Sequence, residues 1–234
     1  MELWKEEQLD QLLKEEDEGK ILLTAMSMAQ QLDFEFLSFG MRTPVATMQP
    51  KIIMLSNYPN EWSQRYKQEN YVTVDPTVAH CLSSMLPILW SDKVFEETPE
   101  FWEEARSHGL RHGWGLSAHD HRGRASMLSV GRSHDEVSIG ELYEKAGQTY
   151  WLCNLLHTVI GEKPVDPQEK ARQLTDREIE VLRWSAEGKK AHEIAGILKV
   201  SERTVSFHVK SAMDKLNAPN RTSAVIQAAI NGLF

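Results

Sequence analysis

Residues 191–216 read AHEIAGILKVSERTVSFHVKSAMDKL, and this stretch predicts two helices separated by a very short turn. Apolar residues recur at helical spacing in both segments, and only Lys199 and Val200 stand between the first segment and Ser201. Ser201 is a favourable N-cap for the second, longer helix. Two helices joined by so tight a turn are typical of a helix-turn-helix, in which the second helix enters the major groove of DNA.

The second helix has an apolar side and an open side when its residues are placed about 100° apart. The apolar side carries Val205, Val209, Ala212, Met213 and Leu216, and the open side carries Arg203, Ser206, Phe207, Lys210 and Asp214. Arg and Lys can donate to guanine O6 and N7 in the major groove, so we expect Arg203, Ser206 and Lys210 to read DNA. Phe207 could contact a thymine methyl group or pack against a neighbouring helix.

Four helices are predicted in the last part of the chain, over residues 175–187, 191–198, 201–216 and 221–231. The first begins with a capping box, because Glu178 follows Thr175 by three residues. Phosphate contacts are expected from side chains that flank the open side or lie near helix starts: Lys189, Lys190, Thr204, His208, Arg221 and Thr222. The alternative is a small helical bundle with solvated charges, but the caps, the turn and the separated faces together favour DNA binding.

The net charge of −8 is divided unevenly along the chain. From Lys170 to Phe234 there are eleven basic and seven acidic residues, a net charge of +4. The preceding residues hold the other fifteen basic and twenty-seven acidic ones, a net charge of −12. A basic module attached to an acidic one favours two domains with different partners.

Composition excludes several classes of protein. With 41% hydrophobic and 26% charged residues, the chain is expected to fold rather than to be disordered throughout. No apolar run approaches the roughly 18 residues that span a bilayer, and the acidic start is unlike a targeting peptide, so we expect a cytoplasmic protein without a membrane partner. Cys81 and Cys153 are the two cysteines, too few and too far apart for a disulfide framework or a zinc module. No cofactor is expected.

The first 160 residues or so predict helices that flank an antiparallel sheet, an α+β sandwich. Helical spacing is found over residues 1–33, 62–70, 98–108 and 138–160, and extended runs over 34–40, 51–56, 88–91, 113–118 and 125–131. The last two extended runs suit a hairpin. The apolar face predicted for residues 138–160 includes Ile139, Leu142, Tyr143, Ala146, Tyr150, Leu152, Leu155, Leu156 and Val159.

Residues 57–90 concentrate aromatic side chains with polar tips around one acid. Trp62 and Tyr66 are four residues apart and share a helix face, while Tyr58 and Asp75 each precede a proline. Such residues can line an apolar pocket that keeps a few directed hydrogen bonds. The same pattern also fits core aromatics and a helix cap, so the residues alone leave both interpretations open.

The C-terminal residues resemble the DNA-binding domain of the LuxR family over their whole length. LTxREIEVLRWxAEGK, EIAxIL, SERTVxFHV and KLNAxN stand at the spacing of that family, and Glu178, Leu182 and Gly188 match its near-invariant positions. The resemblance implies a four-helix module whose last helix pairs two protomers on a palindromic site.

NYPxEWxxRYxxxNYxxxDPTVxHC, PIxW and FWEEARxxGLRHGW are similar to the autoinducer-binding domain of acyl-homoserine-lactone receptors, in the LasR- and QscR-like branch. The resemblance covers about residues 20–160 and implies a PAS- or GAF-like α/β/α sandwich. It also implies that Tyr58 donates to the acyl-amide carbonyl, Asp75 accepts the amide N–H and Trp90 donates to the lactone carbonyl. The other implied pocket residues are Trp62, Tyr66, Val78 and Ser129, with Phe101, Leu110 and Trp114 near the lactone.

Two positions depart from the family pattern. Gly115 stands where some relatives carry Thr or Ser, which removes a hydrogen bond to the ligand and is expected to add room. Ser63 stands where LasR-like receptors carry an Arg near the acyl chain. The length of the acyl chain and the preference for a 3-oxo group are therefore open.

These observations predict a quorum-sensing transcription regulator with a ligand domain (residues 1–162), a linker (163–172) and a helix-turn-helix domain (173–234). Its expected partners are an N-acyl-homoserine lactone as effector, a second copy of the chain, palindromic promoter DNA and RNA polymerase. One alternative is a LuxR-type regulator that senses another small apolar amide or ester. The other is a lactone hydrolase, for which the candidate residues are His80, Cys81, Ser117, His119, Asp120 and His121 and lack catalytic spacing.

Overall fold

The computed structural model describes residues 4, 6–42, 52–162, 174–230 and 232–234. The chain divides into two compact units, and each is described by itself. The predicted linker, residues 163–172, lies outside the described residues, and the exact domain boundaries stay predictions. No helix in the described part of the chain has the length and apolar character needed to cross a bilayer.

The first unit contains six α-helices and five strands within its described residues. In chain order they are α1 (Glu6–Lys14), α2 (Glu18–Gln30), β1 (Phe36–Arg42), β2 (Ile52–Ser56), α3 (Asn60–Gln68), the 3-10 turn η1 (Tyr71–Thr73), α4 (Pro76–Ser83), β3 (Ile88–Leu89), α5 (Pro99–Ser107), β4 (His112–His119), β5 (Ala125–Arg132) and α6 (Ile139–Gly161). The strands form one antiparallel sheet in the order β2-β1-β5-β4-β3.

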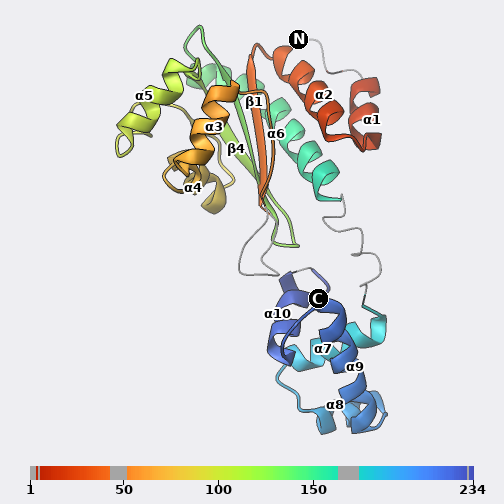
Figure 1. Ribbon diagram of the computed structural model, residues 1–234. Helices are drawn as coiled ribbons and strands as arrows, with labels where there is room; N and C mark the ends of the chain where they lie inside the picture. Colours follow the sequence, from red (N-terminus) through yellow and green to blue (C-terminus); the bar gives the residue numbers. More distant parts are fainter. Residues whose placement is uncertain (1–3, 5, 43–51, 163–173, 231) are drawn as a thin grey trace. The chain divides into compact units, whose positions relative to one another are not determined.

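The sheet lies between two helical layers (Figure 1). Helices α1, α2 and α6 cover one face, and α3, α4 and α5 lie on the other. Alternate strand residues point to the α1–α2–α6 layer and form the main core with it, among them Leu37, Phe39, Trp114, Leu116, Leu128 and Val130. This architecture confirms the predicted α/β/α sandwich.

Helix α4 and turn η1 were absent from the sequence-based prediction. Asp75 is the N-cap of α4, and Pro76 occupies its first position, where a missing N–H costs nothing. The helix has only 8 residues, so its apolar spacing is too short to establish a period. The residues leave Asp75 open between a helix cap and a pocket acid, and no helix is predicted after it, whereas α4 begins there.

The apolar face predicted for α6 is wrong at two positions. Ile139 and Tyr143 are 59% and 73% exposed, whereas Leu142, Leu152 and Leu156 are buried. Apolar side chains surround most of the circumference of this 23-residue helix, and the sheet covers only one side of it. The sequence pattern could not determine which side that would be.

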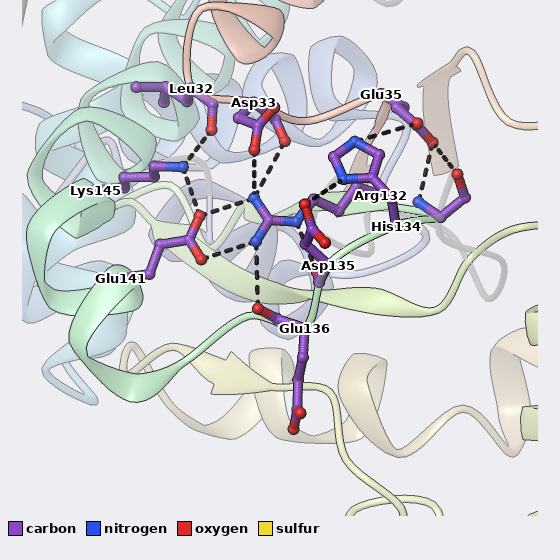
Figure 2. Close-up of polar contacts among 10 residues, drawn as sticks. Leu32, Asp33, Glu35, Arg132, His134, Asp135, Glu136, Glu141 and Lys145 are labelled. Carbon is purple, nitrogen blue, oxygen red and sulfur yellow. Dashed lines mark hydrogen bonds and ion pairs between the residues drawn. The ribbon is translucent and has the colours of Figure 1, made fainter.

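A buried arginine joins the end of β5 to the ends of two helices (Figure 2). Arg132 Nη1 lies 2.8 Å from Asp33 Oδ2 and 2.8 Å from Glu141 Oε1, and Nη2 lies 2.9 Å from Glu141 Oε2. Lys145 Nζ also bonds Glu141 and donates to the carbonyl of Leu32 at 2.7 Å. Burial would raise the pKa of Glu141, but the bonds from Arg132 and Lys145 outweigh it and lower the pKa.

The second unit consists of four helices in its described residues: α7 (Asp176–Ala186), α8 (Ala191–Leu198), α9 (Glu202–Leu216) and α10 (Arg221–Ile230). Ser201 Oγ accepts the Thr204 N–H at 3.1 Å, as expected for the N-cap of α9. Lys199 ends α8 in the left-handed region, with φ of 54°, and so completes the turn within three residues. The helix-turn-helix inferred from the sequence is confirmed.

Candidate ligand site and DNA-binding face

Asp75 uses its two carboxylate oxygens for different contacts. Oδ1 caps α4 by accepting the Thr77 N–H at 2.9 Å and the Thr77 hydroxyl at 2.6 Å. Oδ2 accepts the Tyr66 hydroxyl at 3.0 Å. Burial raises the pKa of Asp75, and the bonds from Thr77 and Tyr66 oppose that rise. The cap and the directed acceptor, which the sequence left as alternatives, thus coexist in one side chain.

The Tyr66 hydroxyl bonds this carboxylate, and the Tyr58 hydroxyl lies within the influence of its charge. Burial raises the pKa of Tyr58, the negative charge of Asp75 raises it further, and a hydrogen bond with Ser129 opposes the rise. The pKa of Tyr66 is raised by burial and then by Asp75. Side chains from β5, the β2–α3 connection, α3 and the start of α4 therefore lie close together. Each phenol can act as a hydrogen-bond donor.

Trp90 presents a buried donor without an acceptor. Among the described residues, no partner lies within hydrogen-bonding distance of its Nε1. The ring packs on two glycines, since a Cβ on Gly131 would come within 2.7 Å of it and a Cβ on Gly113 within 3.0 Å. An unpaired buried N–H costs about 1–3 kcal/mol. The two glycines thus fix the Trp90 ring in place, while its indole N–H has no hydrogen-bond acceptor among the described residues.

An aromatic cluster fills the layer between the sheet and helices α3 and α5. Trp62 stacks on Tyr71 with ring centroids 5.8 Å apart and packs against Phe101 at 5.6 Å. Leu110 is buried in the same cluster, and Tyr58, Tyr66 and Trp90 border it. Val78 is half-buried in the first turn of α4. The structure thus groups nine of the ten predicted pocket residues on one side of the sheet.

The prediction for Trp114 is wrong. Its ring meets Phe34 edge-on at 4.7 Å in the core beneath α1, α2 and α6, on the opposite face of the sheet. Side chains alternate along a strand, so Gly113 and Gly115 face the aromatic cluster and Trp114 cannot. This alternation can be read from the sequence, and it excludes Trp114 from the pocket.

Gly115 does not add room, contrary to expectation. A Cβ there would lie 3.0 Å from Met127 Cε, 3.4 Å from Ile88 Cγ2 and 3.7 Å from Cys81 Sγ. The Met127 side chain therefore occupies the space that a larger residue would need. Met127 lies two residues before Ser129 on β5, so both side chains point to the same face of the sheet. The sequence therefore indicates, through the alternation of side chains along a strand, that Met127 faces the site.

Two of the residues considered for catalysis, Ser117 and His119, make structural contacts with the backbone. Ser117 Oγ donates to the Ser84 carbonyl at 2.6 Å, and His119 Nε2 lies 2.8 Å from the Cys81 carbonyl. Burial raises the pKa of the Cys81 thiol to about 12, which disfavours the reactive thiolate. Within the described ranges, no group of three His, Cys, Asp or Glu side chains is placed to hold a metal ion.

Helix α9 presents the predicted open side to solvent. Arg203, Ser206, Phe207 and Lys210 are exposed, whereas Val205 and Ala212 are fully buried on the opposite side. Thr204 and His208 are half-buried at the margins of the exposed face. The helical wheel is therefore confirmed, and three polar or basic side chains share one accessible surface.

Four of the six residues predicted to contact phosphate lie near helix starts: Lys189, Lys190, Arg221 and Thr222. Lys190 precedes α8 and its N–H donates to Glu193 at 2.8 Å, and Thr222 is exposed in the first turn of α10. Arg221 Nη2 donates to the Lys189 carbonyl at 2.6 Å, so part of the Arg221 side chain is used inside the unit. Arg221 and Lys189 are half-buried.

A buried glutamate fixes α9 against α7. Glu178 accepts the Ser211 hydroxyl at 2.6 Å, the Lys215 ammonium at 2.7 Å and the Thr175 N–H at 2.7 Å. Burial would raise its pKa, but these hydrogen bonds lower it to about 2. The same residue completes the capping box of α7. It thereby sets the position of the helix that carries Arg203 and Lys210.

A sandwich with directed hydrogen-bonding groups, followed by a helix-turn-helix, defines a ligand-responsive transcription regulator. The autoinducer-binding-domain family model matches residues 18–160, and the model for bacterial regulatory proteins of the luxR family matches residues 172–228. The chain therefore belongs to the LuxR family. It is an autoinducer-binding, DNA-binding quorum-sensing regulator, and its relatives are transcriptional regulators rather than enzymes.

Similarity to individual regulators extends over nearly the whole chain. Transcriptional activator protein AnoR of Acinetobacter nosocomialis is 42% identical over 238 residues, covering 100% of both chains. The HTH-type quorum-sensing regulator RhlR of Pseudomonas aeruginosa is 35% identical and covers 88% of this chain and 86% of that protein. The structure of SdiA in complex with octanoyl-rac-glycerol has a TM-score of 0.82 at 32% identity, covering 98% of this chain and 95% of that one.

Proposed function

We propose that the first unit binds an N-acyl-homoserine lactone and that the chain, as a homodimer, then binds a palindromic promoter site. It acts in the cytoplasm, and RNA polymerase is its further partner. The Trp90 indole N–H carries this proposal, because it is buried without an acceptor among the described residues, beside the aromatic cluster that Tyr66, the hydrogen-bond partner of the Asp75 carboxylate, also borders. A ligand carbonyl there would supply the missing acceptor. The ligand-binding residues are those predicted, without Trp114.

The polar atoms around Asp75 complement such a ligand. A homoserine lactone with an acyl chain offers an amide N–H, an amide carbonyl and a lactone carbonyl. Asp75 Oδ2 accepts the N–H, Tyr58 donates to the amide carbonyl and Trp90 donates to the lactone carbonyl. Trp62, Tyr66, Val78, Phe101, Leu110 and Ser129 complete the surroundings.

The test of the ligand is thermal unfolding of the full-length chain with a panel of acyl-homoserine lactones of different chain lengths. A ligand that binds the native state at a hundred times its Kd stabilises that state by about 2.7 kcal/mol, so at least one lactone should raise the Tm. A Tm and a DNA affinity that ignore every lactone would contradict the proposal.

An acylglycerol is a second candidate ligand. SdiA, which shares this fold, has been solved with octanoyl-rac-glycerol. An acylglycerol supplies an ester carbonyl to Trp90 or Tyr58 and a hydroxyl to Asp75, so the same three groups could serve. Including 1-octanoyl-rac-glycerol in the panel decides between the two classes, since the effector should give the larger rise in Tm and in DNA affinity.

The proposed DNA-binding face is the exposed side of α9, with Arg203, Ser206 and Lys210 directed to bases. The flanking contacts to phosphate come from Lys189, Lys190, Thr204, His208, Arg221 and Thr222. Arg203→Glu and Lys210→Glu should each abolish specific binding in a mobility-shift titration without lowering the Tm. Arg183→Glu, which changes an exposed charge on α7, is the matched control. Unchanged operator affinity in the α9 variants would refute this assignment.

A further inference from the structure

Phe207 stands out on the proposed DNA-binding face because it is apolar and open to solvent. It is 67% exposed, whereas the other six phenylalanines of the chain are buried or half-buried. Its ring lies 5.7 Å from that of His208, in an edge-on arrangement. Of the two uses that the sequence left open, packing into the unit is therefore excluded.

The orientation of Phe207 is fixed by the opposite side of α9. Val205 and Ala212 are fully buried there, and Glu178 holds Ser211 and Lys215 against α7. The helix cannot turn about its axis without exposing these groups. Phe207 must therefore remain beside the exposed Arg203, Ser206 and Lys210.

We propose that Phe207 contacts the 5-methyl group of a thymine in the major groove and so selects an A·T pair next to the pairs read by Arg203 and Lys210. A phenyl ring has no hydrogen-bond donor or acceptor, and the thymine methyl is the apolar group that unmodified DNA shows in that groove. The two flanking cations bring the ring to DNA rather than to an apolar protein surface. This inference rests on the DNA-binding face proposed above.

The experiment uses the full-length chain with the effector found in the thermal panel and a random duplex library. After selection, each thymine of the enriched site is replaced in turn by uracil, which removes only the methyl group. Wild-type protein should lose about fourfold in affinity at one thymine of each half-site, the equivalent of roughly 0.8 kcal/mol per buried methyl. Phe207→Ala should bind thymine and uracil sites equally, and Phe207→Leu should keep part of the difference.

Several outcomes would overturn the role of Phe207. A wild-type protein that tolerates uracil at every position has no methyl contact. If the Phe207→Ala variant still prefers thymine to uracil, the methyl group is contacted by another residue. If the variant binds the thymine site and the uracil site more weakly than wild type by the same factor, Phe207 makes a contact other than the one with the methyl group. A selection that enriches no sequence contradicts the proposed function itself. Because the side chain is exposed, unchanged Tm values for the variants verify that the fold survives.

Discussion

At the scale of single residues, Asp75 combines a role in the fold with a proposed role in ligand binding. Its Oδ1 is used by the helix cap, and its Oδ2 faces Tyr66 and the proposed ligand amide. Asn can replace Asp as an N-cap at little cost, so the two roles can be separated by mutation.

Asp75→Asn should leave the Tm of the unliganded chain nearly unchanged and weaken effector binding about tenfold to a hundredfold. The physical reason is that a hydrogen bond to a charged group contributes about 1.5–3 kcal/mol, and the amide offers less. Isothermal titration measures the affinity. Asp75→Ala is the comparison, since it should lose the cap and the binding together. If Asp75→Asn bound the effector as tightly as wild type, the Asp75 carboxylate would not be a ligand contact.

Glu178 gives a prediction for pH. Its pKa is depressed from 4.5 to about 2 in the folded chain, so its contribution is present above pH 4.5 and is lost as the pH falls toward 2. Glu178→Gln should therefore lower the stability of α7 and α9 at neutral pH by about 3 kcal/mol. The difference between variant and wild type should shrink below pH 4.5.

Urea titration of the full-length chain, followed by the amide NMR signals of α9, measures this difference. Glu193→Gln is the control, because that glutamate is exposed and bonds only near its own helix start. If the difference in stability between wild type and the Glu178→Gln variant stayed constant from neutral pH down to about pH 2, Glu178 would not be held ionised by its bonds to Lys215 and Ser211.

At the scale of elements, the Arg132 cluster holds the start of α6 and the end of α2 to β5 (Figure 2). Removing one partner of a buried ion pair typically costs about 3–5 kcal/mol. Arg132→Met should destabilise α6 by that amount, measured by hydrogen exchange of α6 peptides. Arg106→Met breaks the exposed pair with Asp92 and should cost less than about 1 kcal/mol. Equal effects would contradict a structural role for the buried cluster.

Helices with a clear cap, a regular apolar spacing and a short turn beside them were predictable from the sequence. The α8–α9 turn follows from a cap, a clear wheel and two intervening residues. Helix α4 and the exposed face of α6 were not, because short or uniformly apolar segments carry no usable period. For the site, the resemblance indicates the right residue types but includes Trp114, which the alternation of side chains along β4 turns toward the opposite face of the sheet.

At the scale of the whole molecule, an acidic ligand-binding unit and a basic DNA-binding unit share one chain. The net charge of +4 over the residues from Lys170 onward gives a single chain a modest attraction for phosphate. Two linked protomers gain affinity without any new contact, by a factor of about a hundred or more. The selected palindrome should therefore bind at least about a hundredfold more tightly than a duplex with one half-site. Equal affinities in a mobility-shift titration would contradict a dimeric reader.

The most direct test of the ligand proposal is to remove the Trp90 N–H and keep an aromatic ring, by Trp90→Phe. Because the donor is unsatisfied in the unliganded chain, we predict that the Tm without ligand does not fall by the cost of a lost hydrogen bond. The effector affinity, measured by isothermal titration, should fall about tenfold or more. An affinity equal to that of the wild type would contradict the account, since the buried N–H would then have no ligand carbonyl to meet.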